Sequence, residues 1–426
     1  MNPISTASGN SLPVRGVEKG FVVLVLILSM GAFQNLSIAG PIETQNMGMV
    51  GMQILWSILY LITLIFYFRN CDRPLQTIFI VSPIIVVVLV AAASTFWSQD
   101  QALTLRRSVA LILTLVFGVY FASRFSRKDQ LRLLAWALSV CIVFSFLFEL
   151  FELNPSQGFP GWYGVFDIKN ELGQTMVLST LVFLFLKKIE PKYKVRANIG
   201  FVASVILLIL SRAMTATVIF FSLLVLIPYL EWTFRKGKQR VFGGIAFLLV
   251  GGMSAGFYIL THLDEVTRLL GKDPALTGRL PLWIVSAIMA LQRPWLGYGF
   301  NAFWLPNQTY MPRMWQLLSW MPPQAHNGIL ELWLEVGLIG TGVFLFAFAH
   351  YAVKALKLLR HDADPTAAWP ASFLILFFLG NLTTAFFLVT NNVYFILYVA
   401  LAASMCMKDD TASVFSRTFV PKPSHV

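Results

Sequence analysis

The sequence predicts an all-α polytopic membrane protein of about twelve transmembrane helices, with one large periplasmic loop that contains an interfacial helix. The chain has 426 residues, of which 57% are hydrophobic and 12% are charged, whereas soluble domains carry about 25% charged residues. Apolar runs long enough to cross a hydrocarbon core recur from Phe21 to Met407. The alternating pattern of a membrane barrel is absent, so these runs satisfy their backbone groups as helices.

Twelve apolar runs are expected to be spans: residues 20–40, 48–68, 76–97, 107–123, 130–151, 170–187, 196–211, 213–232, 240–260, 327–352, 368–388 and 390–407. They divide the chain into a cytoplasmic N-terminal segment (1–19), transmembrane helices 1–9 (20–260), a large periplasmic loop (261–326), transmembrane helices 10–12 (327–407) and a cytoplasmic tail (408–426). The first run is long for a signal peptide and lacks a clear cleavage site, so a retained helix is expected.

Basic residues are concentrated on one side of this topology. With the N-terminus inside, only nine of the 32 Lys and Arg residues fall outside the cytoplasmic segments: Arg106, Arg107, Lys169, Arg212, Arg268, Lys272, Arg279, Arg293 and Arg313. This bias predicts that both termini are cytoplasmic. It also explains most of the net charge of +12, so we expect the lipid bilayer and no nucleic acid as a partner.

The long loop is an exception to the short connections elsewhere, and such loops are usually functional or disordered. Apolar residues recur in it at helical spacing, with Thr277 as a possible N-cap: Leu280, Trp283, Ile284, Ala287, Ile288 and Leu291. About 16 residues at 1.5 Å each reach only ~24 Å, so we expect a helix at the outer membrane interface. A thirteenth span would instead place Lys354, Lys357 and Arg360 outside, against the charge bias.

The outward basic residues are candidates for binding phosphate, because the Arg guanidinium contacts phosphate oxygens through two N–H groups at once. Arg212 lies at a tight turn between two short apolar runs, where its charge needs a partner. We favour a functional role for Arg212 and Arg279. Headgroup contacts or ion pairs are favoured for Arg106, Arg107, Arg268 and Arg313.

His326 stands at the outer edge of the tenth span and could act as a general base near neutral pH, although a lone interfacial His often has a structural role. Glu331 and Glu335 follow it on roughly one helix face. Intramembrane acids are often functional, but here we favour a role as counter-ions to loop Arg residues. Lys169 and Asn170 form a polar entry to the sixth span.

Several types of site have no counterpart in the sequence. There is no Walker loop, no HExxH, no paired CxxC and no GxSxG turn. The three Cys residues are unclustered, and acids or His do not cluster in the outward segments as a metal site requires. We therefore expect neither a metal nor a cofactor.

Four motifs, taken in order, resemble those of the O-antigen ligase and polysaccharide polymerase family (the WaaL–Wzy type), with ExoQ-like exopolysaccharide polymerases as the most similar members. His326-Asn327, nine residues and Gly337-Leu-Ile-Gly340 fit the family's His-Asn-x9-Gly-x-x-Gly signature. The second motif is Ile168-Lys169-Asn170-Glu-Leu-Gly173, in which Ile168 replaces the usual His. The third is Leu210-Ser211-Arg212. The fourth is Thr277-Gly278-Arg279 with Trp283, followed by Pro294-Trp-Leu-Gly297-Tyr-Gly299.

The resemblance implies glycosyl transfer from an undecaprenyl-diphosphate-linked saccharide to an acceptor sugar hydroxyl, at the outer face of the bacterial inner membrane. Direct displacement would invert the anomeric centre without a metal. In this reading His326 takes the hydroxyl proton, and Arg212 and Arg279 stabilise the diphosphate. Substrate contacts would come from Lys169, Asn170, Arg293, Trp283 and Glu331, and sugar-facing aromatic rings from Trp295, Tyr298, Trp304, Tyr310, Trp315 and Trp320.

Other functions remain open at this stage. A polymerase of repeat units, helped by a chain-length regulator, and a ligase that transfers polymer to lipid A core would use the same donor. A flippase for lipid-linked saccharides would usually show internal repeats and polar groups deep within its helices, and neither is evident. A peptidoglycan glycosyltransferase is a third class, which the His-Asn-x9-Gly spacing disfavours.

Overall fold

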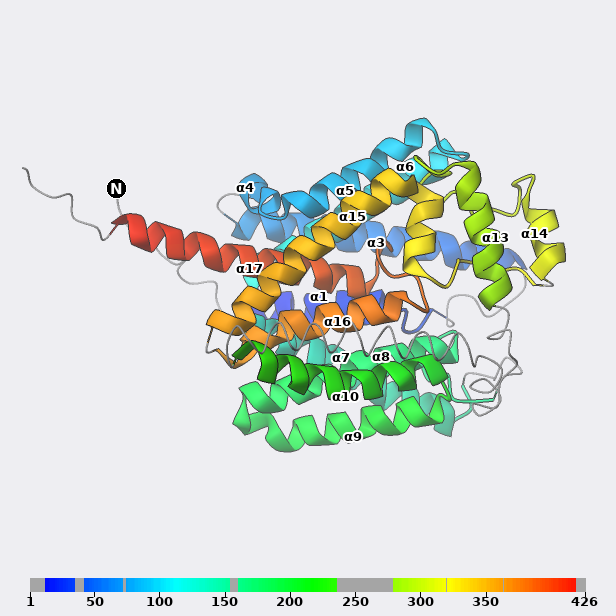
Figure 1. Ribbon diagram of the computed structural model, residues 1–426. Coiled ribbons are helices and arrows are strands. Elements are labelled where there is room, and N and C mark those ends of the chain that lie inside the picture. Colours follow the sequence, from blue (N-terminus) through cyan, green and yellow to red (C-terminus); the bar gives the residue numbers. More distant parts are fainter. Residues whose placement is uncertain are drawn as a thin grey trace, which may run out of the picture. The chain divides into compact units, whose positions relative to one another are not determined.

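The computed structural model describes residues 12–34, 42–71, 74–153, 160–235, 279–318, 320–362 and 364–418. Within these ranges every regular element is a helix (Figure 1), which confirms the all-α fold class. Seven of the described helices are long and apolar enough to cross a membrane. The expected ninth span and loop residues 261–278 lie outside the described residues, and the total of twelve spans stays a prediction.

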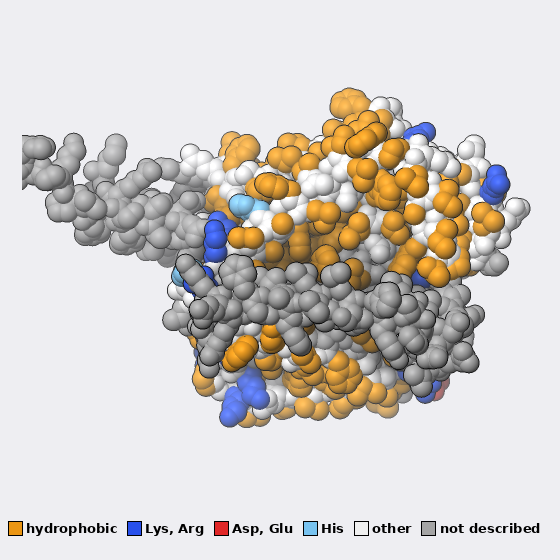
Figure 2. All heavy atoms as spheres, in the orientation of Figure 1, with side chains coloured by type: hydrophobic (Ala, Val, Ile, Leu, Met, Phe, Trp, Pro, Cys, Tyr) orange, Lys and Arg blue, Asp and Glu red, His pale blue; other side chains and the backbone are white. Residues whose placement is uncertain are grey.

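The surface of these helices is apolar where a soluble protein would be polar. On α9 (Lys194–Leu210), Ile199, Val202 and Ile209 are 64%, 54% and 63% exposed. Hydrophobic side chains also cover much of the described surface seen in Figure 2. Contiguous exposed apolar surface on this scale requires a lipid or protein environment. The chain is therefore a multi-pass membrane protein.

The first of two compact units comprises Met1–Ile62 and Phe125–Thr217. It contains α1 (Leu12–Ser29), part of α3 (Ile42–Asn70), α7 (Arg127–Leu150), α8 (Lys169–Ile189) and α9. Helix α8 is central, because most of its side chains are buried and it packs against both α7 and α9. The hydroxyl oxygens of Ser179 and Ser204 lie 2.7 Å apart and join α8 to α9.

The second unit comprises Thr63–Arg124 and Val218–Val426. Its complete helices are α4 (Pro74–Phe79), α5 (Ser82–Ala93), α6 (Gln101–Arg124), α13 (Arg279–Gln292), α14 (Met311–Leu318), α15 (Gly328–His361), α16 (Ala368–Asn381) and α17 (Val393–Thr418), while α10 (Met214–Arg235) and α3 contribute to both units. Helix α15 packs against α5 and α16, and α17 packs against α6. Gly118 permits that last contact, because a Cβ there would lie 2.8 Å from Val399.

Three expected spans have different bounds in the structure. Helix α1 ends at Ser29, since Gly31 adopts a φ of +81° and the Phe33 N–H donates to the Val165 carbonyl. Residues 76–97 form two helices, because the proline in the first turn of α5 favours a new helix start. Helix α16 ends at Asn381, whose side-chain oxygen accepts the Phe386 N–H at 2.8 Å and closes a turn.

Helix α15 is interrupted at Gly337, where φ is +68° and ψ is −174°. The break frees backbone groups that the segment from Pro294 to Gly299 satisfies. The Tyr298 and Gly299 N–H groups donate to the Leu334 and Glu335 carbonyls at 2.8 and 2.9 Å, and on the other side of the break Leu338 N–H donates to Pro294 O at 2.8 Å. The loop is thereby anchored directly on a membrane helix.

Glycine is required on both sides of this contact. A Cβ at Gly337 would lie 2.1 Å from the Trp295 carbonyl oxygen, and one at Gly297 would lie 2.6 Å from the Leu334 carbonyl oxygen. Both residues also have positive φ, a region that side-chain-bearing residues seldom adopt. The Gly-x-x-Gly motif in α15 and the Gly-x-Gly motif in the loop therefore each supply a glycine, Gly337 and Gly297, to the same backbone contact.

Gly337→Ala is expected to lower the free energy of unfolding by at least about 2 kcal/mol, because the left-handed conformation alone costs about 1–2 kcal/mol and the new Cβ would clash with Trp295. Thermal unfolding of the detergent-solubilised protein measures the effect. Gly342→Ala is the matched control on the same helix, since nothing lies within 4 Å of a Cβ there. Equal stability of the two variants would contradict this account of the break.

Candidate functional site

The described part of the loop has its own hydrophobic core, which lies at the N-terminal end of α15 (Figure 1). Helices α13 and α14 pack together there, and α13 packs against α15. The fully buried members include Leu282, Met311 and Leu334. Helix α13 matches the helix expected in the loop, and its 14 residues span about 21 Å, too short to cross a bilayer. The described part of the loop is thus packed around a core of its own. The N-cap candidate Thr277 lies outside the described residues.

His326 occupies a strained turn just before α15. Its φ is +49°, which is uncommon for a residue with a side chain and is a feature of functional sites. Asn327 is the N-cap of α15, because its side-chain oxygen accepts the Ile329 and Leu330 N–H groups at 3.0 and 3.1 Å. The His-Asn pair of the motif therefore consists of a partly buried imidazole and the N-cap residue of α15.

The residue before His326 is held from both sides. Glu331 accepts the Ala325 N–H at 2.6 Å, and the Trp283 indole N–H donates to the Ala325 carbonyl at 3.1 Å. Glu331 is fixed in turn by the Trp304 indole N–H at 2.8 Å. We call Trp283, Ala325, Glu331 and Trp304 the Ala325 clamp. It joins α13, the loop and α15, and it holds the strained His326 backbone in place.

The two acids of α15 serve as hydrogen-bond acceptors. Glu335 is buried and accepts the Asn301 N–H at 3.1 Å. Together with Glu331 and Gln324 it borders a cavity of about 190 Å³. In the described part of the chain neither acid lies within ion-pair distance of an Arg, although the charges of Glu335 and Arg107 act on each other. The contacts that hold the two carboxylates are backbone and indole N–H groups.

Burial and charge keep the His326 imidazole neutral. Burial lowers its pKa, and the positive charge of Arg279 at the start of α13 lowers it further, to about 4. Burial also lowers the pKa of Arg279. No hydrogen bond or ion pair engages the Arg279 guanidinium within the described residues. A half-buried cation beside a neutral imidazole is an arrangement suited to bind an anion and accept a proton.

Some of the other aromatic residues of the loop pack inside it, and others are exposed. Tyr298 is buried, with its ring edge-on to Phe303 and tilted against Tyr310, so the expectation that it faces a sugar ring is wrong. Trp304 belongs to the Ala325 clamp, and Trp315 packs against the loop core. Trp295 and Trp320 remain exposed, and the Trp320 ring stacks on the His326 imidazole at 6.1 Å between centroids.

Arg293, expected to contact substrate, is exposed and places its guanidinium 4.9 Å from the centre of the Tyr298 ring. This cation–π contact orients the side chain without removing its charge from solvent. Its substrate role stays a prediction. Among the described residues, no group of three His, Cys, Asp or Glu residues could hold a metal ion.

Arg212, Lys169 and Asn170 belong to the first compact unit. Arg212 is exposed at the turn after α9 with a φ of +52°. Residues 160–162 run beside this turn: the Trp162 N–H donates to the Leu210 carbonyl, and Lys169 Nζ donates to the Pro160 carbonyl at 3.0 Å. The unit therefore gathers Arg212 and Lys169 around one short segment, and their place relative to His326 stays a prediction.

Sequence reasoning missed what fixes His326. It gives no sign that Trp283 and Glu331 both bind the Ala325 backbone, and their substrate role stays a prediction. Asn327 was noted only as part of a motif, although an Asn directly before an apolar helical run is an N-cap signal. The contact between Gly297 and the break at Gly337 is also indicated in the sequence, because a glycine within a helix or strand often marks a close approach of two backbones.

Comparisons with known proteins find a match to a family model in the part of the chain that holds most of these residues. Residues 198–345 match the O-antigen ligase family model. The "Exopolysaccharide production protein ExoQ" of Rhizobium meliloti (strain 1021) is 25% identical over 309 residues, which cover 70% of this chain and 69% of that protein. The "Putative polysaccharide ligase RP358" of Rickettsia prowazekii (strain Madrid E) is 26% identical over 125 residues, or 24% of this chain and 31% of that protein.

The matched residues include Arg212, Arg279 and His326, and the similarity to ExoQ extends over 70% of the chain. The resemblance that the motifs predicted is thus confirmed: this multi-pass protein matches the O-antigen ligase family model over residues 198–345 and is similar to an exopolysaccharide production protein and to a putative polysaccharide ligase.

Proposed function

We propose that the chain is a membrane glycosyltransferase that polymerises undecaprenyl-diphosphate-linked repeat units into exopolysaccharide at the periplasmic face of the bacterial inner membrane. The observation that carries the proposal is the neutral His326 imidazole, held in a strained turn by the Ala325 clamp beside the Arg279 cation, which has no ion-pair partner among the described residues. The O-antigen ligase domain and the similarity to ExoQ support a polysaccharide polymerase or ligase.

In the proposed reaction, a hydroxyl oxygen of the acceptor sugar attacks the anomeric carbon of the donor. The bond from that carbon to the diphosphate oxygen breaks, and the diphosphate leaves with the electron pair. The His326 imidazole takes the hydroxyl proton. Attack opposite the leaving group inverts the anomeric centre. Arg279 stabilises the charge that develops on the diphosphate, and Arg212 is a second contact. In this scheme the displacement and the proton transfer require no metal.

The low pKa of His326 gives the site an order of events. An imidazole whose pKa is about 4 is a weak base, because efficient general bases have pKa values near the working pH. Burial is the larger cause of this low pKa, and the Arg279 charge is the smaller one. A diphosphate bound at Arg279 would offset the smaller cause, so the pKa of His326 would rise and the imidazole would be a stronger base with the donor in place.

A ligase is the second candidate, favoured by the family description and by the similarity to a protein named as a polysaccharide ligase. Both activities use the same lipid donor and differ in the acceptor. We prefer the polymerase because the similarity to ExoQ covers far more of the chain than the similarity to the putative ligase does. A chain-length regulator would be a partner of the polymerase.

Purified protein reconstituted with lipid-linked repeat units is expected to produce a ladder of products from the donor alone. His326→Ala should reduce the rate at least about 100-fold, because it removes the general base. Asn307→Ala, at an exposed loop position, is the control and should keep the full rate. Product that forms only after lipid A core is added would indicate a ligase. Transbilayer movement of the donor without any new glycosidic bond would overturn the proposal.

The pH dependence of kcat/KM is expected to show an acid limb near pH 4, because His326 is protonated only below its lowered pKa. Activity is then present above this pH and lost as the pH falls through it. Arg279→Gln removes the nearby positive charge, so the pKa of His326 should rise and the limb should move to higher pH, together with a fall in kcat of about 100-fold.

Arg313→Gln is the matched control for this shift, since it removes one exposed loop charge on α14. It should leave the acid limb unchanged. An acid limb that stays at the same pH in Arg279→Gln would show that Arg279 does not act on His326.

A further inference from the structure

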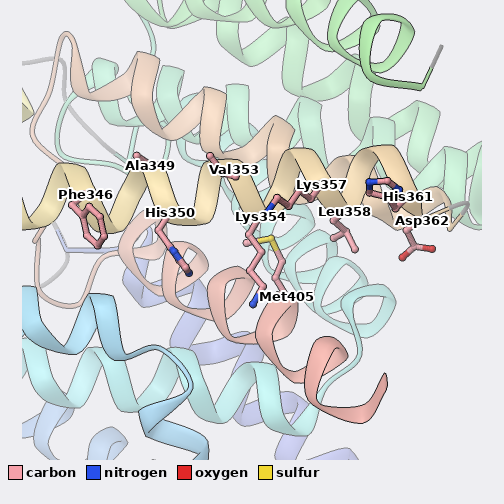
Figure 3. A pocket seen from close by; sticks show the side chains of 10 residues that line it. All are labelled: Phe346, Ala349, His350, Val353, Lys354, Lys357, Leu358, His361, Asp362 and Met405. Atoms are coloured by element: carbon pink, nitrogen blue, oxygen red, sulfur yellow. The ribbon is translucent and has the colours of Figure 1, made fainter. Parts of the chain in front are cut away.

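A groove of about 850 Å³ runs along the C-terminal half of α15, at the opposite end of that helix from His326 (Figure 3). Its lining runs from Phe346 to Asp362 on α15 and includes Met405 on α17. This stretch of helix covers about 24 Å, close to the length of one leaflet with its headgroups. The reaction proposed for His326 makes no use of this groove.

The groove is basic along one helix face. His350, Lys354, Lys357 and His361 follow each other at spacings of four, three and four residues, which place them on one side of an α-helix. In Figure 3 the side chains of His350 and Lys354 leave α15 on the side that faces α17, and Lys354 Nζ lies 3.3 Å from Cys406 Sγ.

Polarity changes along the groove. The end nearer the middle of α15 is lined by the apolar side chains of Phe346 and Val353, 71% and 52% exposed, with the His350 imidazole between them. The other end carries the lysines and one acid, Asp362, whose carboxylate accepts the Asp364 N–H at 3.0 Å. An apolar channel that ends in cationic groups matches an amphiphile with an anionic head and a hydrocarbon chain.

A simpler explanation accounts for only part of this pattern. Basic side chains in the last turn of a helix interact favourably with its carbonyl end, and this explains Arg360 and His361. Lys354 and Lys357 lie before that turn and border a hollow that a helix-capping role would not need. Long cationic side chains within an apolar span are costly unless they reach a polar partner.

We propose that this groove binds an anionic phospholipid, with its phosphate between Lys354 and Lys357 and an acyl chain along Phe346, Val353 and Met405. Basic pockets between transmembrane helices are suited to such headgroups, because the lysine charge pairs with the phosphate while the helices replace neighbouring lipid tails. The site is separate from the proposed glycosyl transfer and would fix the far end of α15 in the bilayer.

Native mass spectrometry of the detergent-solubilised full chain tests the proposal. Phosphatidylglycerol should bind at least about tenfold more tightly than phosphatidylcholine with the same acyl chains. Lys354→Gln/Lys357→Gln should weaken phosphatidylglycerol binding about thirtyfold, since two lysine contacts to an anionic headgroup are lost. Lys354→Arg/Lys357→Arg should retain the preference. Ala349→Trp, which fills the groove without changing charge, should weaken the binding of both lipids.

Lys187→Gln/Lys194→Gln is the matched control, because it removes two exposed lysines from the ends of α8 and α9. It should bind phosphatidylglycerol as the unaltered chain does. Equal binding of the two lipids, an unchanged preference in Lys354→Gln/Lys357→Gln, or an equal loss in the control would overturn the proposal. Displacement of the lipid by glycerol phosphate at the same concentration would show a soluble phosphate site, and tighter binding of undecaprenyl phosphate would show a different occupant.

Discussion

The backbone N–H and the carbonyl of Ala325 are both hydrogen-bonded to side chains from helices, and the geometry of the candidate site depends on these bonds. Glu331 in α15 holds the N–H, and Trp283 in α13 holds the carbonyl. A residue with a side chain at a φ of +49° tends to relax toward common conformations. The flanking bonds oppose that relaxation, and so the imidazole of His326 keeps one position against Arg279. Such preorganisation matters because small errors in the position of a catalytic group are costly in rate.

The clamp in turn depends on the break in α15. Because Gly337 leaves helical geometry, the loop segment around Gly297 reaches the backbone of α15 and is held by it. The residue after this segment contacts α6 and the end of α5: the Phe300 N–H donates to Ser94 Oγ, just after α5, and Thr104 Oγ1 in α6 donates to the Phe300 carbonyl. A loop tied to two membrane helices through its own backbone can carry a site with little freedom of movement, although it lies outside the apolar spans.

The sequence was sufficient for the features that periodicity and composition control. Apolar runs predicted the helices, the 3.6-residue spacing after Thr277 predicted α13, and the spacing of His326-Asn327 to Gly337 predicted the family. It was insufficient wherever a side chain pairs with a distant backbone group. The role of Glu331 depends on the conformation of Ala325, and the burial of Tyr298 depends on Phe303 and Tyr310. An acid or an aromatic residue in a loop looks the same in a sequence whether it faces substrate or supports a turn.

The central claim is that Glu331 acts on the reaction through the position of His326. A double-mutant cycle on the single-turnover rate of glycosyl transfer measures this directly. Glu331→Gln cannot accept hydrogen bonds from both Ala325 and Trp304 as the carboxylate does. In the otherwise unaltered protein it should slow transfer about tenfold or more. In the His326→Ala background the same change should alter the remaining rate by less than about twofold, because groups that act as one unit are not additive. A similar further loss in both backgrounds would contradict the account and would indicate that Glu331 contacts the substrate itself.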